Sequence, residues 1–110
     1  MTAPQNLSDK ELKTALARSL GEAVWNDLDI HHQQGRLLFL ESSLDIFEVG
    51  IALARDTREI VTTWLESESL RKPNESDIKS FLNNQKQVFL CMIVQPYVLA
   101  QIEQKSEHLN

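Results

Sequence analysis

The residues able to do chemistry in this chain are few and lie far apart. His31 and His32 are adjacent near the end of a predicted helix, where a cation gains from the helix dipole and an imidazole can ligate a metal. Adjacent helical residues point about 100° apart, whereas metal-binding pairs on helices are spaced by three or four residues. The pattern predicts no metal site, and His31 is more simply a C-terminal helix cap or the partner of a carboxylate.

Two further polar residues, Glu48 and Gln95, interrupt apolar stretches. A half-buried Glu48 would need a partner such as Arg36, Arg55 or a histidine, and a water-facing carboxylate or a structural ion pair is the simpler interpretation. Gln95 follows seven apolar residues and precedes a proline, so its amide either ties down the chain there or faces a pocket or partner. His31, Glu48 and Gln95 are therefore the candidate ligand-binding residues.

Cys91 predicts no chemistry, because a reactive thiolate needs a polar and electropositive site and this thiol lies in the most apolar run of the chain. As the single cysteine it excludes an intramolecular disulfide and indicates a reducing compartment. No glycine-rich phosphate loop, nucleophile elbow, zincin helix or EF-hand loop is present. We expect no catalytic residue and no cofactor, and an enzyme is the less favoured class.

Length and composition favour one globular domain over residues 1–110. The ordered core is expected over about 7–102, with polar, frayed ends at 1–6 and 103–110. Hydrophobic residues make up 42% and charged residues 25% of the chain, which is ordinary globular usage. The net charge of −5 repels phosphate backbones and anionic lipid, so neither nucleic acid nor a membrane is an expected partner. Because the chain starts with no secretory pattern, the expected location is cytoplasmic.

Four segments have helical signals. Ser8 and Glu11 form a capping box before a helix that extends to about residue 20, and a second helix over 22–32 has Trp25 and Leu28 on its apolar stripe. A third helix is expected to begin at an Asp56 cap and to end before 72–73. The fourth is capped by Asn74 or Ser76, turns Ile78, Phe81 and Leu82 inward, and ends at 83–84.

Strands are expected over 37–40 and 88–94, the latter as the central strand of the sheet. Large and small apolar residues alternate over 45–54, which favours a strand paired in a hairpin with 37–40, and a helix is the alternative. Residues 97–102 continue as strand or helix. The expected class is α+β: a small, mostly antiparallel sheet of two to four strands against three or four helices, helix-rich overall.

These residues together resemble a family of short bacterial proteins, frequent in cyanobacteria and proteobacteria, that is classed as a domain of unknown function. The resemblance rests on Trp25 with Leu28 and His31, LDIFEVGIALARD at 44–56, IVTTWL at 60–65, LRKP at 70–73 and FLCMIVQPYVLAQ at 89–101. These pieces cover most of residues 22–102. The resemblance implies a compact cytoplasmic protein and supplies no activity, substrate or catalytic residue.

The favoured function is a non-catalytic protein-binding or regulatory module, with an unknown protein or a second copy of the chain as partner. Trp25 and Trp64 lie on predicted apolar stripes, where aromatic residues are usually core, and they are also the candidate interface anchors. The alternative is a small enzyme or ligand-binding protein whose pocket, between sheet and helices, gathers His31, Glu48 and Gln95. A third interpretation, an antitoxin-like or DNA-linked regulator, requires salt-dependent DNA binding.

Overall fold

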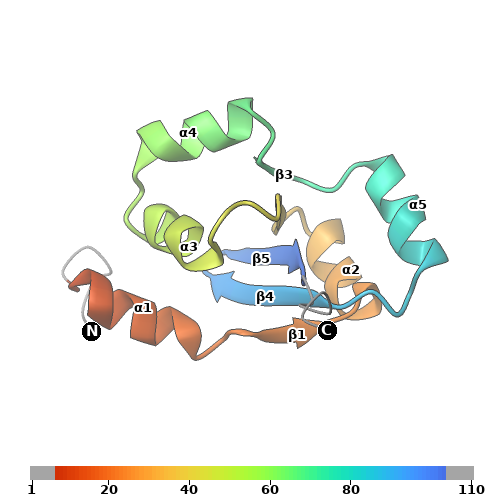
Figure 1. Cartoon of the computed structure of the whole chain (residues 1–110), viewed down its shortest axis with the longest axis horizontal. Helices are drawn as coiled ribbons and strands as arrows, with labels where there is room; N and C mark the ends of the chain where they lie inside the picture. The colour runs from red at the N-terminus through yellow and green to blue at the C-terminus, as the bar shows by residue number, and fades with distance from the viewer. Residues whose placement is uncertain (1–6, 104–110) are drawn as a thin grey trace, which may run out of the picture.

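The computed structural model describes residues 7–103, which form five helices and one five-stranded sheet (Figure 1). The elements, in chain order, are α1 (Asp9–Ala17), β1 (Gly21–Ala23), α2 (Trp25–Gln33), β2 (Leu37–Leu40), α3 (Ile46–Ala54), α4 (Arg58–Glu66), β3 (Leu70–Arg71), α5 (Glu75–Asn83), β4 (Phe89–Val94) and β5 (Tyr97–Ile102). The α+β class is confirmed. The predicted frayed ends fall, apart from Glu103, outside the described residues.

The sheet has the strand order β1-β4-β5-β2-β3, and β2 and β5 run parallel while all other neighbours are antiparallel. It is thus larger and more mixed than the two to four mostly antiparallel strands expected. β5 is the central strand, because it pairs with both β4 and β2 along its length. The prediction that 88–94 is central was wrong: the outer neighbour of β4 is β1, which pairs only with Phe89–Cys91.

Each face of the sheet carries its own hydrophobic cluster, because successive strand side chains point to opposite sides. Leu37 and Phe39 of β2 pack with α2 and α5, whereas Leu38 and Leu40 pack with α1, α3 and α4. β4 and β5 divide in the same way, with Phe89 on the α2 side and Met92 on the α3 side. In Figure 1, α1, α3 and α4 gather at one end of the view and α2 and α5 at the other.

Residues 46–54 form a helix, so the predicted strand and its hairpin with 37–40 were wrong. The expectation assumed that so apolar a helix could not be buried in a small protein. It is covered because α3 packs against α1, α4 and the sheet together. The Asp45 side chain starts the helix by accepting a hydrogen bond of 2.8 Å from the Phe47 N–H, and Gly50 lets it approach β4 closely.

Most of the other helix boundaries follow local signals in the sequence. The Ser8–Glu11 capping box is present at α1, and Asn74 and Asp77 form another at α5. Asp56 does not cap α4: it adopts φ 55°, and Thr57 is the N-cap residue. On α5, Phe81 is buried as expected, but Leu82 faces solvent with 51% of its surface exposed.

Candidate functional site

An apolar depression lies beside α4, over the starts of β2 and β5. We call it the α4 hollow, and its volume is about 310 Å³. It is lined by Gly35, Leu38, Leu53, Val61, Leu65, Leu70, Lys72 and Tyr97. Its position is between the sheet and the helices α3 and α4. Ligand pockets are typically concave and mostly apolar, with volumes of roughly 300–1,000 Å³, so this hollow is at the lower end of that range.

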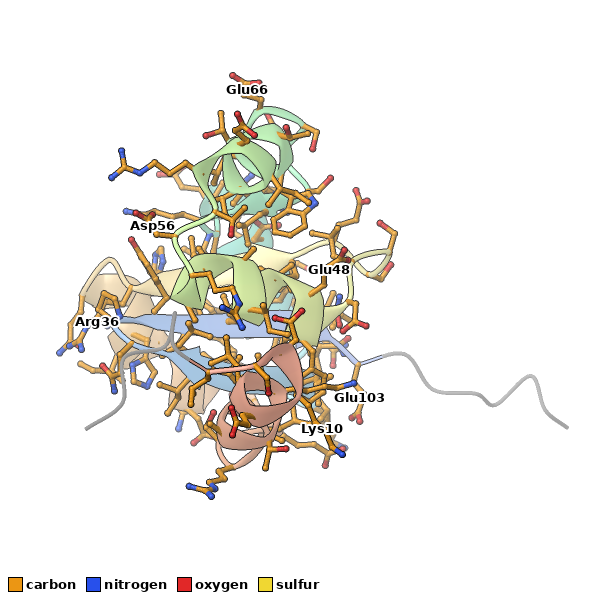
Figure 2. The ribbon with its side chains drawn as sticks, turned by 90° about the vertical axis from the view of Figure 1, so that its left-hand side faces the viewer. Lys10, Arg36, Glu48, Asp56, Glu66 and Glu103 are labelled. Carbon is orange, nitrogen blue, oxygen red and sulfur yellow. The ribbon has the colours of Figure 1, made fainter. Side chains whose placement is uncertain are left out.

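The sequence of α4 explains why a hollow remains there. Its apolar residues form one stripe, but only Trp64 at the centre of that stripe is buried. Val61 and Leu65 lie along the margin beside the hollow, and Leu65 keeps 47% of its surface exposed. Figure 2 shows α4, ending near Glu66, at the outside of the molecule. Leu65 therefore contributes an apolar rim that the fold itself does not bury.

Two polar side chains, Lys72 and Tyr97, belong to the lining of the α4 hollow. Lys72 follows β3, and its ammonium approaches Gly35, where a Cβ would lie 3.9 Å from Nζ. Gly35 adopts φ 75° and ends α2 in a Schellman motif. Its N–H donates to the backbone carbonyl of His32 at 2.9 Å, and the Arg36 N–H donates to the backbone carbonyl of His31 at 3.0 Å. At this part of the rim the backbone of Gly35, which has no side chain, faces the Lys72 ammonium.

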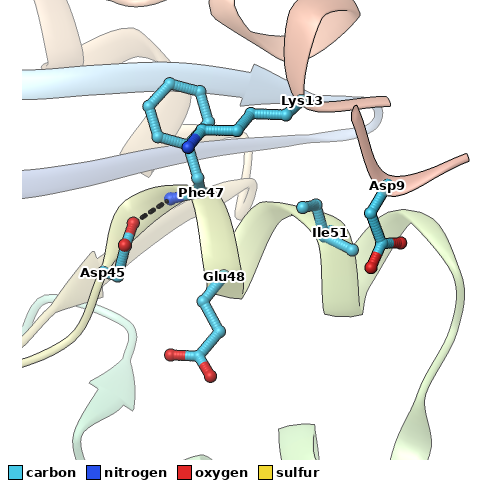
Figure 3. Close-up of a pocket in the computed structure, with 6 residues that line it drawn as sticks. All are labelled: Asp9, Lys13, Asp45, Phe47, Glu48 and Ile51. Carbon is cyan, nitrogen blue, oxygen red and sulfur yellow. Dashed lines mark hydrogen bonds between the residues drawn. The ribbon is translucent and has the colours of Figure 1, made fainter. Parts of the chain in front are cut away.

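A second hollow, of about 460 Å³, lies between α1 and α3 and is polar (Figure 3). Asp45 is engaged as the α3 cap, and Asp9 pairs with Arg55 at 2.8 Å. The Lys13 ammonium lies 5.0 Å from the centre of the Phe47 ring. Apart from Glu48, the polar groups of this hollow thus already serve helix ends and the contact of α1 with α3.

Glu48 lines the same second hollow as an exposed residue, and Figure 3 shows its carboxylate directed away from Lys13. Neither expected arginine is its partner. Arg55 pairs with Asp9, and Arg36 donates to Gln34 on the opposite side of the molecule in Figure 2. Glu48 therefore faces water, but from helix α3 and not from the edge strand that was expected.

A third hollow, of about 200 Å³, lies on the other face of the sheet beside β1 and contains His31 and Cys91. The His31 Nδ1 is buried and has no hydrogen-bond partner among the described residues. Burial raises the pKa of the Cys91 thiol to about 12, and the negative charge of Asp27 adds to the effect. Cys91 is therefore a thiol at neutral pH, and within residues 7–103 no group of three side chains is arranged to hold a metal ion.

The three predicted ligand-binding residues do not converge. His31 is on the α2 side of the sheet and Glu48 is on the α3 side, so the sheet separates them. Gln95 is exposed in the two-residue turn between β4 and β5, where its peptide bond to Pro96 is cis. The prediction of one pocket built from all three was wrong, because each residue belongs to a different surface.

The two tryptophans lie in separate cores. Trp25 is 4% exposed and packs against Phe81 with ring centroids 5.2 Å apart, and Trp64 is 8% exposed in the cluster under α4. Neither presents its ring to solvent as an interface anchor would. Lys72 and Tyr97 were not among the site residues predicted from the sequence. The available signals were the lysine between a strand and a proline, and a single tyrosine just after the proline turn.

The fold defines a small α+β protein, and none of its described helices is both long and apolar enough to cross a membrane. A family model described as "Protein of unknown function (DUF2288)" matches residues 11–102, and the chain belongs to that family. The resemblance found in the sequence is thereby confirmed.

One solved structure supports the fold independently. The solution NMR structure of PA1075 from Pseudomonas aeruginosa, a proteobacterium, is similar to this chain with a TM-score of 0.72 and 28% sequence identity. The match covers 96% of this chain and 95% of that one, so the two agree over essentially their whole length. No curated protein matches the chain.

Proposed function

We propose that this protein is a non-catalytic binding module, regulatory in character, and that it holds a small apolar ligand in the α4 hollow. The observation that carries the proposal is the hollow itself: five apolar side chains around about 310 Å³, with Leu65 left half-exposed at the rim. Burial of that surface by a ligand is favourable by about 25 cal/mol per Å². A small-ligand site was the alternative interpretation of the sequence, and the α4 hollow supports it with residues other than His31, Glu48 and Gln95.

The titratable groups that line hollows are spread over three separate surfaces of the molecule. A general acid or base must lie within hydrogen-bonding reach of the reacting atom. His31, Glu48 and Cys91 line the other two hollows, and the lining of the α4 hollow contains only Lys72 and Tyr97 as titratable groups. The proposal includes a cytoplasmic location, in keeping with the single unpaired Cys91.

Mapping the binding of 1-octanol by amide chemical shifts tests the proposal. We expect saturable shift changes centred on Gly35, Val61 and Leu65, with little change around Phe81 on the other face of the sheet. Leu65→Asp is expected to abolish them, because it puts a charge on the apolar rim. Leu82→Asp is the matched control, since Leu82 is exposed to a similar extent, 51% against 47%, on α5.

Two results of the chemical-shift experiment would contradict binding in the α4 hollow. Shift changes that centre on another part of the molecule would remove the α4 hollow as the binding site. Equal binding by wild type and Leu65→Asp would do the same.

A second copy of the chain is the protein partner that we propose as a second candidate. Ile60 and Leu65 flank the buried Trp64 on α4 and are 37% and 47% exposed, so this peripheral helix has apolar surface to bury. Sedimentation equilibrium is expected to show a dimer that Ile60→Asp weakens and Leu82→Asp does not. A monomer at every concentration tested would contradict self-association.

A further inference from the structure

We infer that the ligand of the α4 hollow is a small apolar carboxylate, and that the Lys72 ammonium selects its charge. The inference rests on the proposed function, because it concerns the same hollow. It adds the chemical class of the ligand: an unbranched or branched hydrocarbon body with one anionic end.

Lys72 is placed at the rim by the strand that precedes it. β3 pairs antiparallel with β2, with Arg71 opposite Phe39, so the chain leaves the sheet at Lys72 beside the start of β2. Its Nζ then lies over Gly35, where even an added Cβ would be 3.9 Å away. Gly35 must adopt φ 75°, a conformation that side-chain-bearing residues rarely take, so the site opposite Lys72 stays open.

The charge of Lys72 is uncompensated in the described part of the chain. Arg55, Arg58 and Arg71 each pair with an aspartate, whereas no ion pair joins Lys72 to any carboxylate within residues 7–103. It is also the one charged residue in the lining of the hollow as described. An anion at the rim therefore gains an attraction, and a cation is repelled, although the chain as a whole carries a net charge of −5.

The residues of the wall determine the character and size of the uncharged part of the ligand. Leu38 of β2 and Leu70 of β3 are the buried wall residues of the hollow, and Leu53 of α3 and Val61 and Leu65 of α4 complete the apolar lining. Tyr97 is the second polar residue of the lining, and its phenol can hydrogen-bond a carboxylate oxygen. A volume of about 310 Å³ suits a body of modest length, and a longer acyl chain would extend into water.

Comparing octanoate, 1-octanol and octylamine on the same protein tests this class of ligand. We expect octanoate to bind most tightly, in the millimolar range, and octylamine most weakly. Lys72→Met is expected to weaken octanoate about threefold to fivefold, the scale of an exposed charge pair, and to leave 1-octanol unchanged. Lys79→Met, which removes an exposed lysine from α5, is the matched control and should bind octanoate like wild type.

The outcomes separate this inference from the function on which it rests. If 1-octanol and octanoate bind equally well in the hollow, or Lys72→Met has no effect on octanoate, the hollow binds apolar groups and the selection by Lys72 is refuted. If octylamine binds most tightly, the sign of the selection is refuted. If none of the three shifts the amides of the hollow, both proposals fail.

Discussion

Gly50 lies where α3 packs closely against β4. A Cβ at this position would lie 2.4 Å from the Met92 Cε and 3.2 Å from the Leu16 Cδ1. Both side chains are buried, so room for a methyl group requires movement in the core. The small residue thus fixes how closely the helix approaches β4.

Gly50→Ala is expected to lower the free energy of unfolding by about 1 kcal/mol. Alanine gains roughly 0.5–1 kcal/mol of helix propensity, but overpacking a core loses roughly 1–3 kcal/mol. Urea denaturation measures the balance. Gly21→Ala is the control, because a Cβ there meets no atom within 4 Å, and a stabilised Gly50→Ala would show that Met92 yields freely.

The pair of Arg71 and Asp77 predicts a defined pH dependence. The hydrogen bond from the Arg71 guanidinium holds the pKa of the Asp77 carboxyl below its ordinary value of 3.8, and the Asn74 N–H, which donates to the same carboxylate, adds to the effect. Because the pKa of Asp77 is lower in the folded state than in the unfolded state, its ionised carboxylate stabilises the fold at pH values above the unfolded-state pKa. This stabilisation is lost as the pH falls through the folded-state pKa.

Asp77→Asn is therefore expected to lower stability by about 1–2 kcal/mol at pH 7 and by much less near pH 2.5. Urea denaturation of both proteins at the two pH values measures this. Glu75→Gln, in the same helical turn but without the arginine, should show a smaller difference. An Asp77→Asn effect of equal size at both pH values would exclude the charge as its source.

Some residue roles could be inferred from the sequence, and others depended on contacts between distant segments. The caps at Ser8 and Asn74 are local patterns, so they were recognised. Gln95 was chosen as the amide needing partners, but the buried amide is Gln101, whose Nε2 donates to the Glu41 and Leu44 carbonyls at 2.9 and 2.7 Å. Those acceptors are about 60 residues away in sequence, and no local pattern marks them.

At the scale of elements, the open edge of β4 is closed by a side chain. β1 pairs with β4 only as far as Cys91, and beyond it the Ser19 Oγ accepts from the Ile93 N–H at 2.9 Å and lies 3.4 Å from the Ile93 carbonyl oxygen. The Ser19 hydroxyl thus occupies the position of a strand partner for Ile93. It blocks a part of the β4 edge that could otherwise pair with another strand.

Ser19→Ala is expected to accelerate hydrogen exchange at the Ile93 amide while Leu90 and Met92 keep their protection. The loss of one hydrogen bond, about 0.5–1.5 kcal/mol, corresponds to an increase of severalfold. Exchange followed by NMR measures it residue by residue. Ser43→Ala, which removes an exposed hydroxyl bonded to Glu41, is the control, and unchanged exchange at Ile93 would show that the hydroxyl does not protect this edge.

The helix α3 is the element for which the sequence pattern predicted the wrong type of structure. Its alternation of large and small residues is real, and period-two patterning usually indicates a strand. Burial on several sides removes the polar face by which a helix is normally recognised, and only the Asp45 cap remained as a signal. The two-residue β3 and three-residue β1 were missed because strands so short have no periodicity.

For the whole molecule, the two hydrophobic clusters share the strands β2, β4 and β5. Each cluster contains one tryptophan, Trp25 on the α2 side and Trp64 on the α3 side, so each reports on its own core. Because the same strands support both, we expect the two cores to unfold in one transition.

Single-tryptophan variants test this cooperativity. In Trp64→Phe the fluorescence follows Trp25, and in Trp25→Phe it follows Trp64. Within each variant, the urea midpoints from fluorescence and from far-ultraviolet circular dichroism should coincide. Separate midpoints in either variant would show that one side of the sheet unfolds on its own.

The class of the fold could be predicted from the sequence, but the α4 hollow could not. It is assembled from α3, α4, β2, β3 and β5, and its two polar residues, Lys72 and Tyr97, are 25 positions apart. Their meeting depends on the parallel pairing of β2 with β5, a long-range contact without a local signature.

The central claim is that the α4 hollow holds a small ligand, and native mass spectrometry tests it most directly. The wild-type chain and Leu65→Asp would be purified side by side from the cells that naturally produce the protein. We expect an added small-molecule mass on wild type that is absent from Leu65→Asp and present on the Leu82→Asp control. The same bare mass for all three proteins, or an added mass that Leu65→Asp retains, would contradict it.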